Sequence, residues 1–107
     1  MEVSTQGATL RLAGQLDARC TSQVREALAV HIATHGATED VVVDMSGVTG
    51  ADLIALKMLA AASWRATSAG KHLVLCDCAP GVKRLLHLSH LMKLLDVEDH
   101  GTGQRSA

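Results

Sequence analysis

The sequence predicts a single α/β domain with a mixed central β-sheet and helices packed mainly on one face. Two short strands around the turn at Gln6 and Gly7 open the chain as a β-hairpin. Helices and apolar strands then alternate, and right-handed crossovers place successive helices on the same side of a sheet. The 107 residues suffice for one hydrophobic core and are too few for two.

The predicted hairpin joins strands at residues 2–5 and 9–16. In the second of these, Leu10 and Leu12 alternate with Arg11, so that one face is apolar and the other polar. This alternation is typical of a strand with one face against a core.

A helix is expected to follow the hairpin and to reach about His35. Residues 20–22 supply several candidate N-caps, and Gly36 supplies a stop. Apolar residues recur at helical spacing and predict the buried stripe: Val24, Leu28 and Ile32.

The middle of the chain predicts a strand, a loop and a long helix. Residues 41–43 are a continuous apolar run, as in a central strand flanked in parallel. Residues 44–51 contain glycines and hydroxyl side chains and are expected to form a tight loop. A helix over residues 52–69 would begin with Asp52 as its N-cap and end before Gly70. Its expected core stripe is Leu56, Leu59, Ala60, Ser63 and Thr67.

The last elements predicted are a strand at 72–75, a helix from Pro80 to Ser89 and His90, and an edge strand at 94–98. From His100 onward the composition is polar and shows no periodicity. We therefore expect residues 1–99 to form the domain and residues 100–107 to be a disordered tail.

Charge and aromatic content exclude several kinds of function. A formal net charge of −1 argues against nucleic-acid binding and against direct membrane binding by charge. Trp64 is the only aromatic residue, so the chain lacks the stacking platforms used for nucleotides and sugars. Three cysteines and no basic-then-apolar leader are typical of the reducing cytoplasm, where we expect the protein to act.

No residue pattern indicates catalysis or a metal site. Cys76 and Cys78 would face the same side of a strand, but a structural metal ion needs about four converging ligands. We expect buried thiols there and no metal. His87 and His90 lie near the C-terminal end of a helix, where cations are stabilised by the helix dipole, so their positions do not require a binding or catalytic role. The chain has no nucleophile–base arrangement and no phosphate-binding glycine loop, so we expect neither an enzyme nor a cofactor.

Three segments, taken in order and spacing, resemble the STAS domain of bacterial anti-sigma factor antagonists. They are LAGQLD at 12–17, VVVDMSGVT at 41–49 and APGVKRLLHLS at 79–89. The resemblance spans about residues 3–98. It implies a STAS-type fold and a cytoplasmic partner-switching protein, which binds an anti-sigma factor that is also a serine kinase-like ATPase and thereby frees a sigma factor.

The resemblance also locates the position at which the family is phosphorylated. Family members carry Asp-Ser-Ser-Gly or Asp-Ser/Thr-x-Gly there, with the acceptor in the first turn of the following helix. The matching residues 52–55 read Asp-Leu-Ile-Ala, so Ile54 occupies the acceptor position and has no hydroxyl. This implies a docking site that is not switched by a phosphate at that position. Apolar and long side chains continue along the same face at helical spacing, in Ile54, Met58, Ala61 and Arg65.

A helix start of this kind exposes backbone N–H groups and a partial positive charge, which can receive an anion or a partner. The apolar residues at this start favour a protein. The partner-binding surface is therefore expected to comprise Asp17, Thr49, Asp52, Leu53, Ile54, Lys57 and Met58.

Two alternatives concern single residues of this surface. Leu53, and less readily Ile54, would belong to the core if they turned beneath the preceding segment. Thr49, with Ser46 as the other nearby hydroxyl, is the candidate for a displaced phosphoacceptor, although such hydroxyls more often bond their own backbone.

A different class of function is a STAS module that stiffens a larger assembly. Such a scaffold subunit would belong to a stress-signalling complex or to the cytoplasmic side of a lipid ABC transporter. In either class, a second copy of the chain is a further candidate partner through the exposed apolar stripe.

Overall fold

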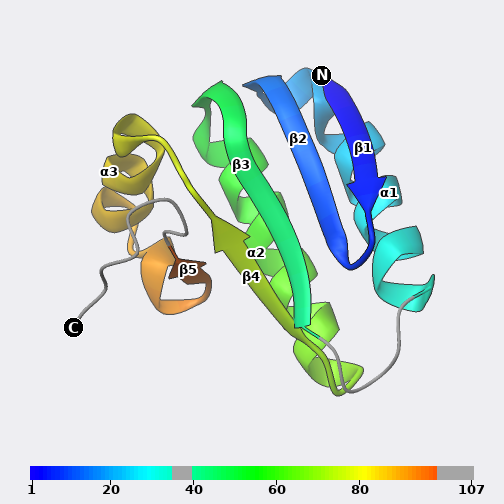
Figure 1. Cartoon of the computed structure of the whole chain (residues 1–107). Coiled ribbons are helices and arrows are strands. Elements are labelled where there is room, and N and C mark those ends of the chain that lie inside the picture. Colours follow the sequence, from blue (N-terminus) through cyan, green and yellow to red (C-terminus); the bar gives the residue numbers. More distant parts are fainter. Residues whose placement is uncertain (35–39, 99–107) are drawn as a thin grey trace.

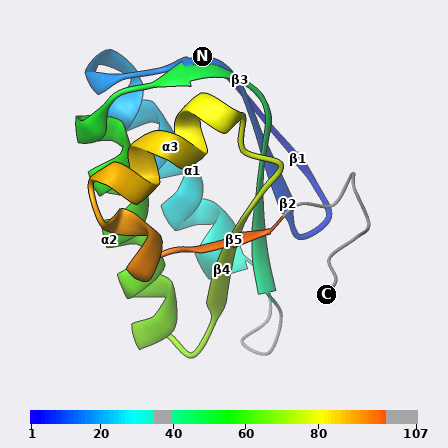
Figure 2. The same cartoon turned by 90° about the vertical axis from the view of Figure 1, so that its left-hand side faces the viewer.

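The computed structural model describes residues 1–34 and 40–98, which form one sheet with helices on one side (Figures 1 and 2). The five strands lie in the order β1-β2-β3-β4-β5. Their bounds are Glu2–Gln6 for β1, Thr9–Leu16 for β2, Asp40–Ala51 for β3, His72–Cys76 for β4 and Asp96–Glu98 for β5. The helices are α1 (Thr21–Thr34), α2 (Leu53–Ser68) and α3 (Pro80–Leu88), with 3-10 turns η1 (Ala18–Cys20) and η2 (Leu91–Lys93).

The sheet is mixed, as predicted. β1 and β2 form the expected antiparallel hairpin, closed by Gly7 at a φ of 61°. β2 with β3, β3 with β4, and β4 with β5 are parallel pairs. Seen edge-on in Figure 2, all three helices lie on the same side of the sheet. The predicted fold class is therefore confirmed.

The hydrophobic core fills the space between this face of the sheet and the helices. Side chains from the three central strands meet side chains from the three helices, and almost all of them are aliphatic. The largest fully buried ones include Leu10, Leu12, Met45, Leu73 and Leu75 from the strands, and Leu28, Leu56, Leu59 and Leu86 from the helices. Burial of this apolar surface is the main stabilising contribution in a chain that is almost without aromatic residues.

The predicted loop at residues 44–51 is wrong, because β3 continues through this segment to Ala51. Met45 and Val48 are buried, whereas Ser46 and Thr49 are exposed. The segment pairs with the second half of β2, ending with Leu16 opposite Ala51, and two register shifts accommodate its irregular spacing. The strand therefore delivers the chain directly to the start of α2.

A close approach of β2 to β3 explains one of the glycines in this strand. A Cβ atom at Gly47 would lie 2.9 Å from the Cβ of Ala13 and 3.1 Å from the carbonyl oxygen of Leu12. Real Cβ atoms essentially never come so near. Gly47 thus permits the two strands to pair where a larger residue would separate them.

The start of α1 also differs from the prediction. The cap is not at residues 20–22 but at Asp17, which begins the turn η1 that leads into α1. The buried stripe is Val24, Leu28 and His31, while Ile32 is only half-buried against the core. The expected end of this helix at His35 and Gly36 lies outside the described residues.

The end of α2 follows the prediction closely. Gly70 has a φ of 81°. Its N–H donates to the Thr67 carbonyl at 3.0 Å, and the Lys71 N–H donates to the Ala66 carbonyl at 2.8 Å. This is the Schellman arrangement that a glycine after a helix favours. Within the predicted core stripe, Thr67 is exposed and Ala66 is buried in its place.

The C-terminal edge strand is shorter than predicted, whereas β4 extends one residue further, to Cys76. The helix α3 begins at Pro80 and is capped at Ser89, as expected. The edge strand begins at Asp96 rather than at residue 94, because η2 occupies the preceding residues. The expected tail at residues 100–107 lies outside the described part. None of the helices in residues 1–34 and 40–98 is long and apolar enough to span a membrane.

Candidate protein-binding site

Asp52 organises the start of α2. Its Oδ1 accepts a hydrogen bond from the Ala55 N–H at 2.9 Å, which is the predicted N-cap. Its Oδ2 accepts a second hydrogen bond, at 3.0 Å, from the N–H of Ala18 in η1. The backbone N–H of Asp52 donates to the Leu16 carbonyl at 3.0 Å. One carboxylate therefore fixes the start of α2 against the end of β2 and the turn after it.

Asp17 lies beside this junction and caps the neighbouring turn. Its Oδ1 accepts from the Arg19 N–H at 3.0 Å, and its Oδ2 lies 3.3 Å from the Arg19 guanidinium. Asp17 thus directly precedes Ala18, the residue whose N–H donates to Asp52, and its part in partner binding stays a prediction. The Arg19 side chain is largely exposed, so this ion pair contributes little to stability.

Leu53 and Ile54 both face outward in the first turn of α2. Their exposed fractions are 38% and 60%, so the alternative that places them in the core is wrong. Asp52 ends the extended strand and turns the chain into the helix, which leaves Ile54 on the outer side of the first turn. Lys57 is also exposed, and Met58 packs partly against the core.

Ile54 forms one wall of a shallow hollow between α1 and α2. The hollow has a volume of about 310 Å³ and is lined by Thr21, Arg25, Ile54, Lys57, Met58, Ala61 and Arg65. The predicted stripe from Ile54 to Arg65 thus lies along a single surface feature. The sequence did not indicate Thr21 and Arg25, because no spacing within α2 points to residues of another helix.

The charge of this hollow has one sign. Among the residues that the structure describes, the charged side chains that line the hollow are Arg25, Lys57 and Arg65, all of them cationic. A surface that combines apolar and cationic side chains is complementary to a partner that presents apolar groups among carboxylates.

Thr49 and Ser46 are exposed on β3, upstream of Asp52. The Ser46 N–H donates to Asp44 Oδ1 at 2.9 Å, while Asp44 Oδ2 lies 3.3 Å from Arg11. Both hydroxyls therefore belong to a paired strand rather than to a loop. Whether either one receives a phosphate stays a prediction.

The three cysteines form no disulfide and are all buried, which confirms the expectation of buried thiols. Among the described residues, no three His, Cys, Asp or Glu side chains come together as a metal site would require. Asp77, between Cys76 and Cys78, has a φ of 57°, so the two cysteines do not belong to one continuous strand.

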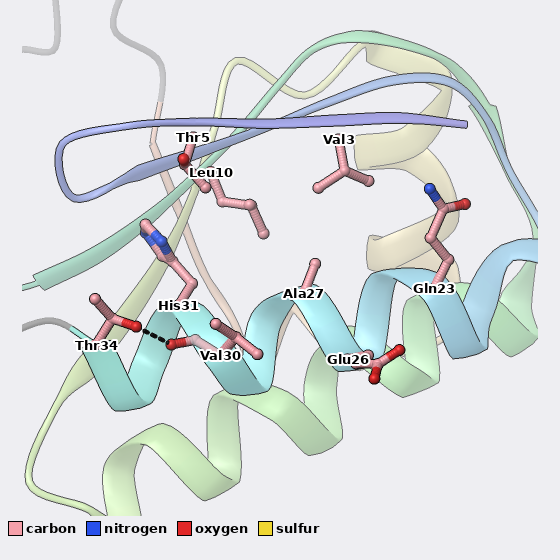
Figure 3. Close-up of a pocket in the computed structure, with 9 residues that line it drawn as sticks. All are labelled: Val3, Thr5, Leu10, Gln23, Glu26, Ala27, Val30, His31 and Thr34. Atoms are coloured by element: carbon pink, nitrogen blue, oxygen red, sulfur yellow. Dashed lines mark hydrogen bonds between the residues drawn. The ribbon is translucent and has the colours of Figure 1, made fainter.

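A larger hollow lies between the β-hairpin and α1 and has a volume of about 520 Å³ (Figure 3). Val3 and Ala27 point into it from opposite sides, and His31 stands at one end. The Nε2 of His31 donates to the Ala8 carbonyl at 2.9 Å, so this buried ring ties α1 to the hairpin turn. No residue of the predicted binding surface lines this hollow.

Comparisons with known proteins agree with this architecture. A family model described as "Mlab, STAS domain" matches residues 1–96. A candidate anti-sigma factor antagonist of Thermotoga maritima, TM1081, superposes with a TM-score of 0.76 at 14% identity, over 94% of this chain and 87% of that one.

Two further solved structures extend the comparison. The anti-sigma factor antagonist SpoIIAA in its unphosphorylated form gives a TM-score of 0.68 at 18% identity, over 92% of this chain and 86% of that one. The phosphorylated form of SpoIIAA, a Bacillus cell fate determinant, gives a TM-score of 0.62 at 17% identity, over 92% of this chain and 89% of that one. At such identities the likeness concerns the fold alone.

Proposed function

The chain belongs to the STAS domain family, and from this premise we propose that it is an anti-sigma factor antagonist-like protein of the cytoplasm. It regulates transcription by binding an anti-sigma factor, a serine kinase-like ATPase, through the start of α2. The observation that carries the proposal is the exposure of Ile54 in the hollow between α1 and α2. The protein acts by binding and not by catalysis.

The energetic argument begins with Ile54. Fully burying an aliphatic side chain of this size contributes about 1.5 to 3 kcal/mol, and more than half of this contribution is still available because Ile54 is 60% exposed. A partner that covers it also covers Met58 and Ala61, which line the same hollow. The surrounding Arg25, Lys57 and Arg65 add electrostatic attraction for an acidic partner, which acts mainly on the rate of association.

The same residue argues against control by phosphate at this position. In a switched protein, a phosphate on the first turn of α2 adds about −1.5 to −2 charges and changes what the surface attracts. Ile54 cannot accept one. The contact is therefore permanent, unless Thr49 acts as a displaced acceptor on the adjoining strand.

A second candidate function is a non-catalytic scaffold subunit of a stress-signalling complex or of a lipid ABC transporter. The matching family model is described as a STAS domain without reference to an anti-sigma factor, so membership of the family is equally compatible with this candidate. The lack of a hydroxyl at residue 54 favours it, since a permanent subunit needs no switch there.

Affinity capture separates the two candidates. The tagged full chain is expressed in its own organism at native level, and bound proteins are identified by mass spectrometry. A small serine kinase-like ATPase supports the antagonist, whereas a transporter ATPase or other STAS proteins support the scaffold. The Ile54→Asp variant should lose the partner, and Val30→Asp, which changes an equally exposed residue of α1, should keep it. A partner retained by Ile54→Asp contradicts binding through the start of α2.

A further inference from the structure

A further hollow lies on the other flank of α2 from the one that contains Ile54, against η2 and the residue after it, Leu94. It has a volume of about 520 Å³ and is lined by Lys57, Ala60, Ala61, Ser63, Trp64, Thr67, Leu91, Lys93 and Leu94. We call this feature the Trp64 groove. Lys57 and Ala61 also line the hollow that contains Ile54, so the two surfaces meet along the outer ridge of α2.

The groove exposes two large apolar side chains. Trp64, the only aromatic residue of the chain, is 73% exposed, and Leu94 is 61% exposed. Between them, Ala60 and Leu91 are buried and belong to the core. Tryptophan is the residue type most often found to dominate binding energy when it is buried at an interface. Exposed apolar residues that gather around one concavity indicate a binding surface.

The charge around the groove selects the kind of partner. Within the described part of the chain, the charged side chains that line the groove are Lys57 and Lys93, and both are cationic. The partner that fits carries negative charge beside its apolar side chains.

The shape of the groove selects the form of the partner. A concave surface between a helix and a short turn accommodates a convex rod, as when an amphipathic helix lies in a hydrophobic groove. Here Trp64 and Leu94 line the walls of a concavity.

We propose that the Trp64 groove receives an amphipathic helix of the partner protein, apolar on one face and acidic along its flanks. This deepens the proposed function and rests on it for the identity of the partner. The partner would then hold the ridge of α2 from both sides, with Ile54 on one flank and Trp64 on the other.

The chain carries its own reporter for this test, because Trp64 is the only tryptophan and the chain has no tyrosine. The probe is a peptide of about 14 residues, or about four helical turns, with leucines at helical spacing, glutamates elsewhere and no aromatic residue. Titration into the full chain should shift the emission of Trp64 to shorter wavelength and saturate. A peptide with lysine in place of glutamate should cause no shift at the same concentrations.

Two charge-reversal variants, one inside the groove and one outside it, test where the peptide binds. Lys93→Glu reverses a charge in the groove and should lower the affinity for the acidic peptide about threefold to tenfold, as is typical of a charge at the edge of an interface. Arg84→Glu makes the same change on the exposed side of α3, outside the groove, and should leave binding unchanged. Equal effects of the two variants, or no saturable shift with the acidic peptide, would overturn the proposal. A shift with anionic vesicles but not with the peptide would assign the groove to a membrane and also overturn it.

The probe titration and the partner-capture experiment can fail separately, so the two proposals are distinguishable. Ile54→Ala removes the side chain from the hollow between α1 and α2 without adding charge and leaves the lining of the Trp64 groove intact, so it should bind the probe as the parent chain does. If the probe binds while Ile54→Asp retains the cellular partner, the proposed function fails and the groove stands. If the probe does not bind while Ile54→Asp loses the partner, the groove proposal alone fails.

Discussion

The Asp52 carboxylate accepts a hydrogen bond from the N–H of Ala18, 34 residues earlier in the chain, at 3.0 Å. The same side chain caps α2 through Ala55. The two hydrogen bonds join the segment after β2 to the first turn of α2, where Ile54 is presented. The position of the binding surface therefore depends on the half-buried Asp52, which holds the first turn of α2 in place.

Replacing Asp52 should lower the stability of the fold. Asp52→Ala removes both hydrogen bonds and should reduce the free energy of unfolding by about 1 to 3 kcal/mol, the sum of a lost N-cap and a lost side chain–backbone bond. Asp52→Asn keeps an acceptor for Ala55 but lacks the second carboxylate oxygen, so a smaller loss is expected. Urea unfolding measures both values. Equal stability of Asp52→Ala and the parent chain would show that these contacts do not hold the site.

Two glycines provide a matched test of the strand geometry. Gly47→Ala places a Cβ 2.9 Å from that of Ala13 and should destabilise the fold by about 1 to 3 kcal/mol through forced separation of β2 and β3. Gly81→Ala, in α3, meets no neighbouring atom and should stabilise by about 0.4 to 1 kcal/mol by restricting the unfolded chain. Thermal unfolding of the pair should give shifts of opposite sign. If Gly47→Ala leaves the stability unchanged, the close approach of β2 to β3 at this residue is contradicted.

Phosphorylation can be examined with the kinase that the family resemblance implies. After incubation with ATP and the cognate anti-sigma factor, intact-mass analysis of the parent chain should show no added phosphate at residue 54. Ile54→Ser restores a hydroxyl in the exposed first turn of α2 and should accept one phosphate, which shows that the kinase is active. A stoichiometric phosphate on Thr49 or Ser46 of the parent chain would mean that the switch has moved upstream rather than been lost.

The thiols offer a simple check of the core. All three cysteines are buried, so a thiol reagent should react slowly with the native protein and completely in denaturant. Rapid reaction of any thiol in the native state would show that the surrounding packing opens readily.

The features that the sequence predicted correctly depend on local chemistry. Asp52 caps a helix, Gly70 ends one with a positive φ, and Pro80 begins another. Each of these roles follows from the backbone preferences of the residue itself. The hairpin at Gly7 belongs to the same group.

The features that the sequence missed depend on distant partners. Ser46, Gly47 and Thr49 are typical of a loop, and they become a strand only because β2 pairs with them. The role of Asp17 as the cap before α1 was hidden by stronger candidates at residues 20–22. In the site, Ile54 and Met58 were predicted from helical spacing, whereas Thr21 and Arg25 enter the same hollow from α1.

The central claim is that a partner binds through Ile54 at the start of α2. The most direct measurement is the affinity of the captured partner for the parent chain, for Ile54→Asp and for Val30→Asp, by calorimetry with purified proteins. An acidic residue in the first turn of a helix favours the helix dipole, so Ile54→Asp should fold as stably as the parent. We predict that Ile54→Asp weakens binding by at least about tenfold, as expected for losing a buried aliphatic contact, and that Val30→Asp changes it little. Equal affinity of Ile54→Asp and the parent chain would contradict the account.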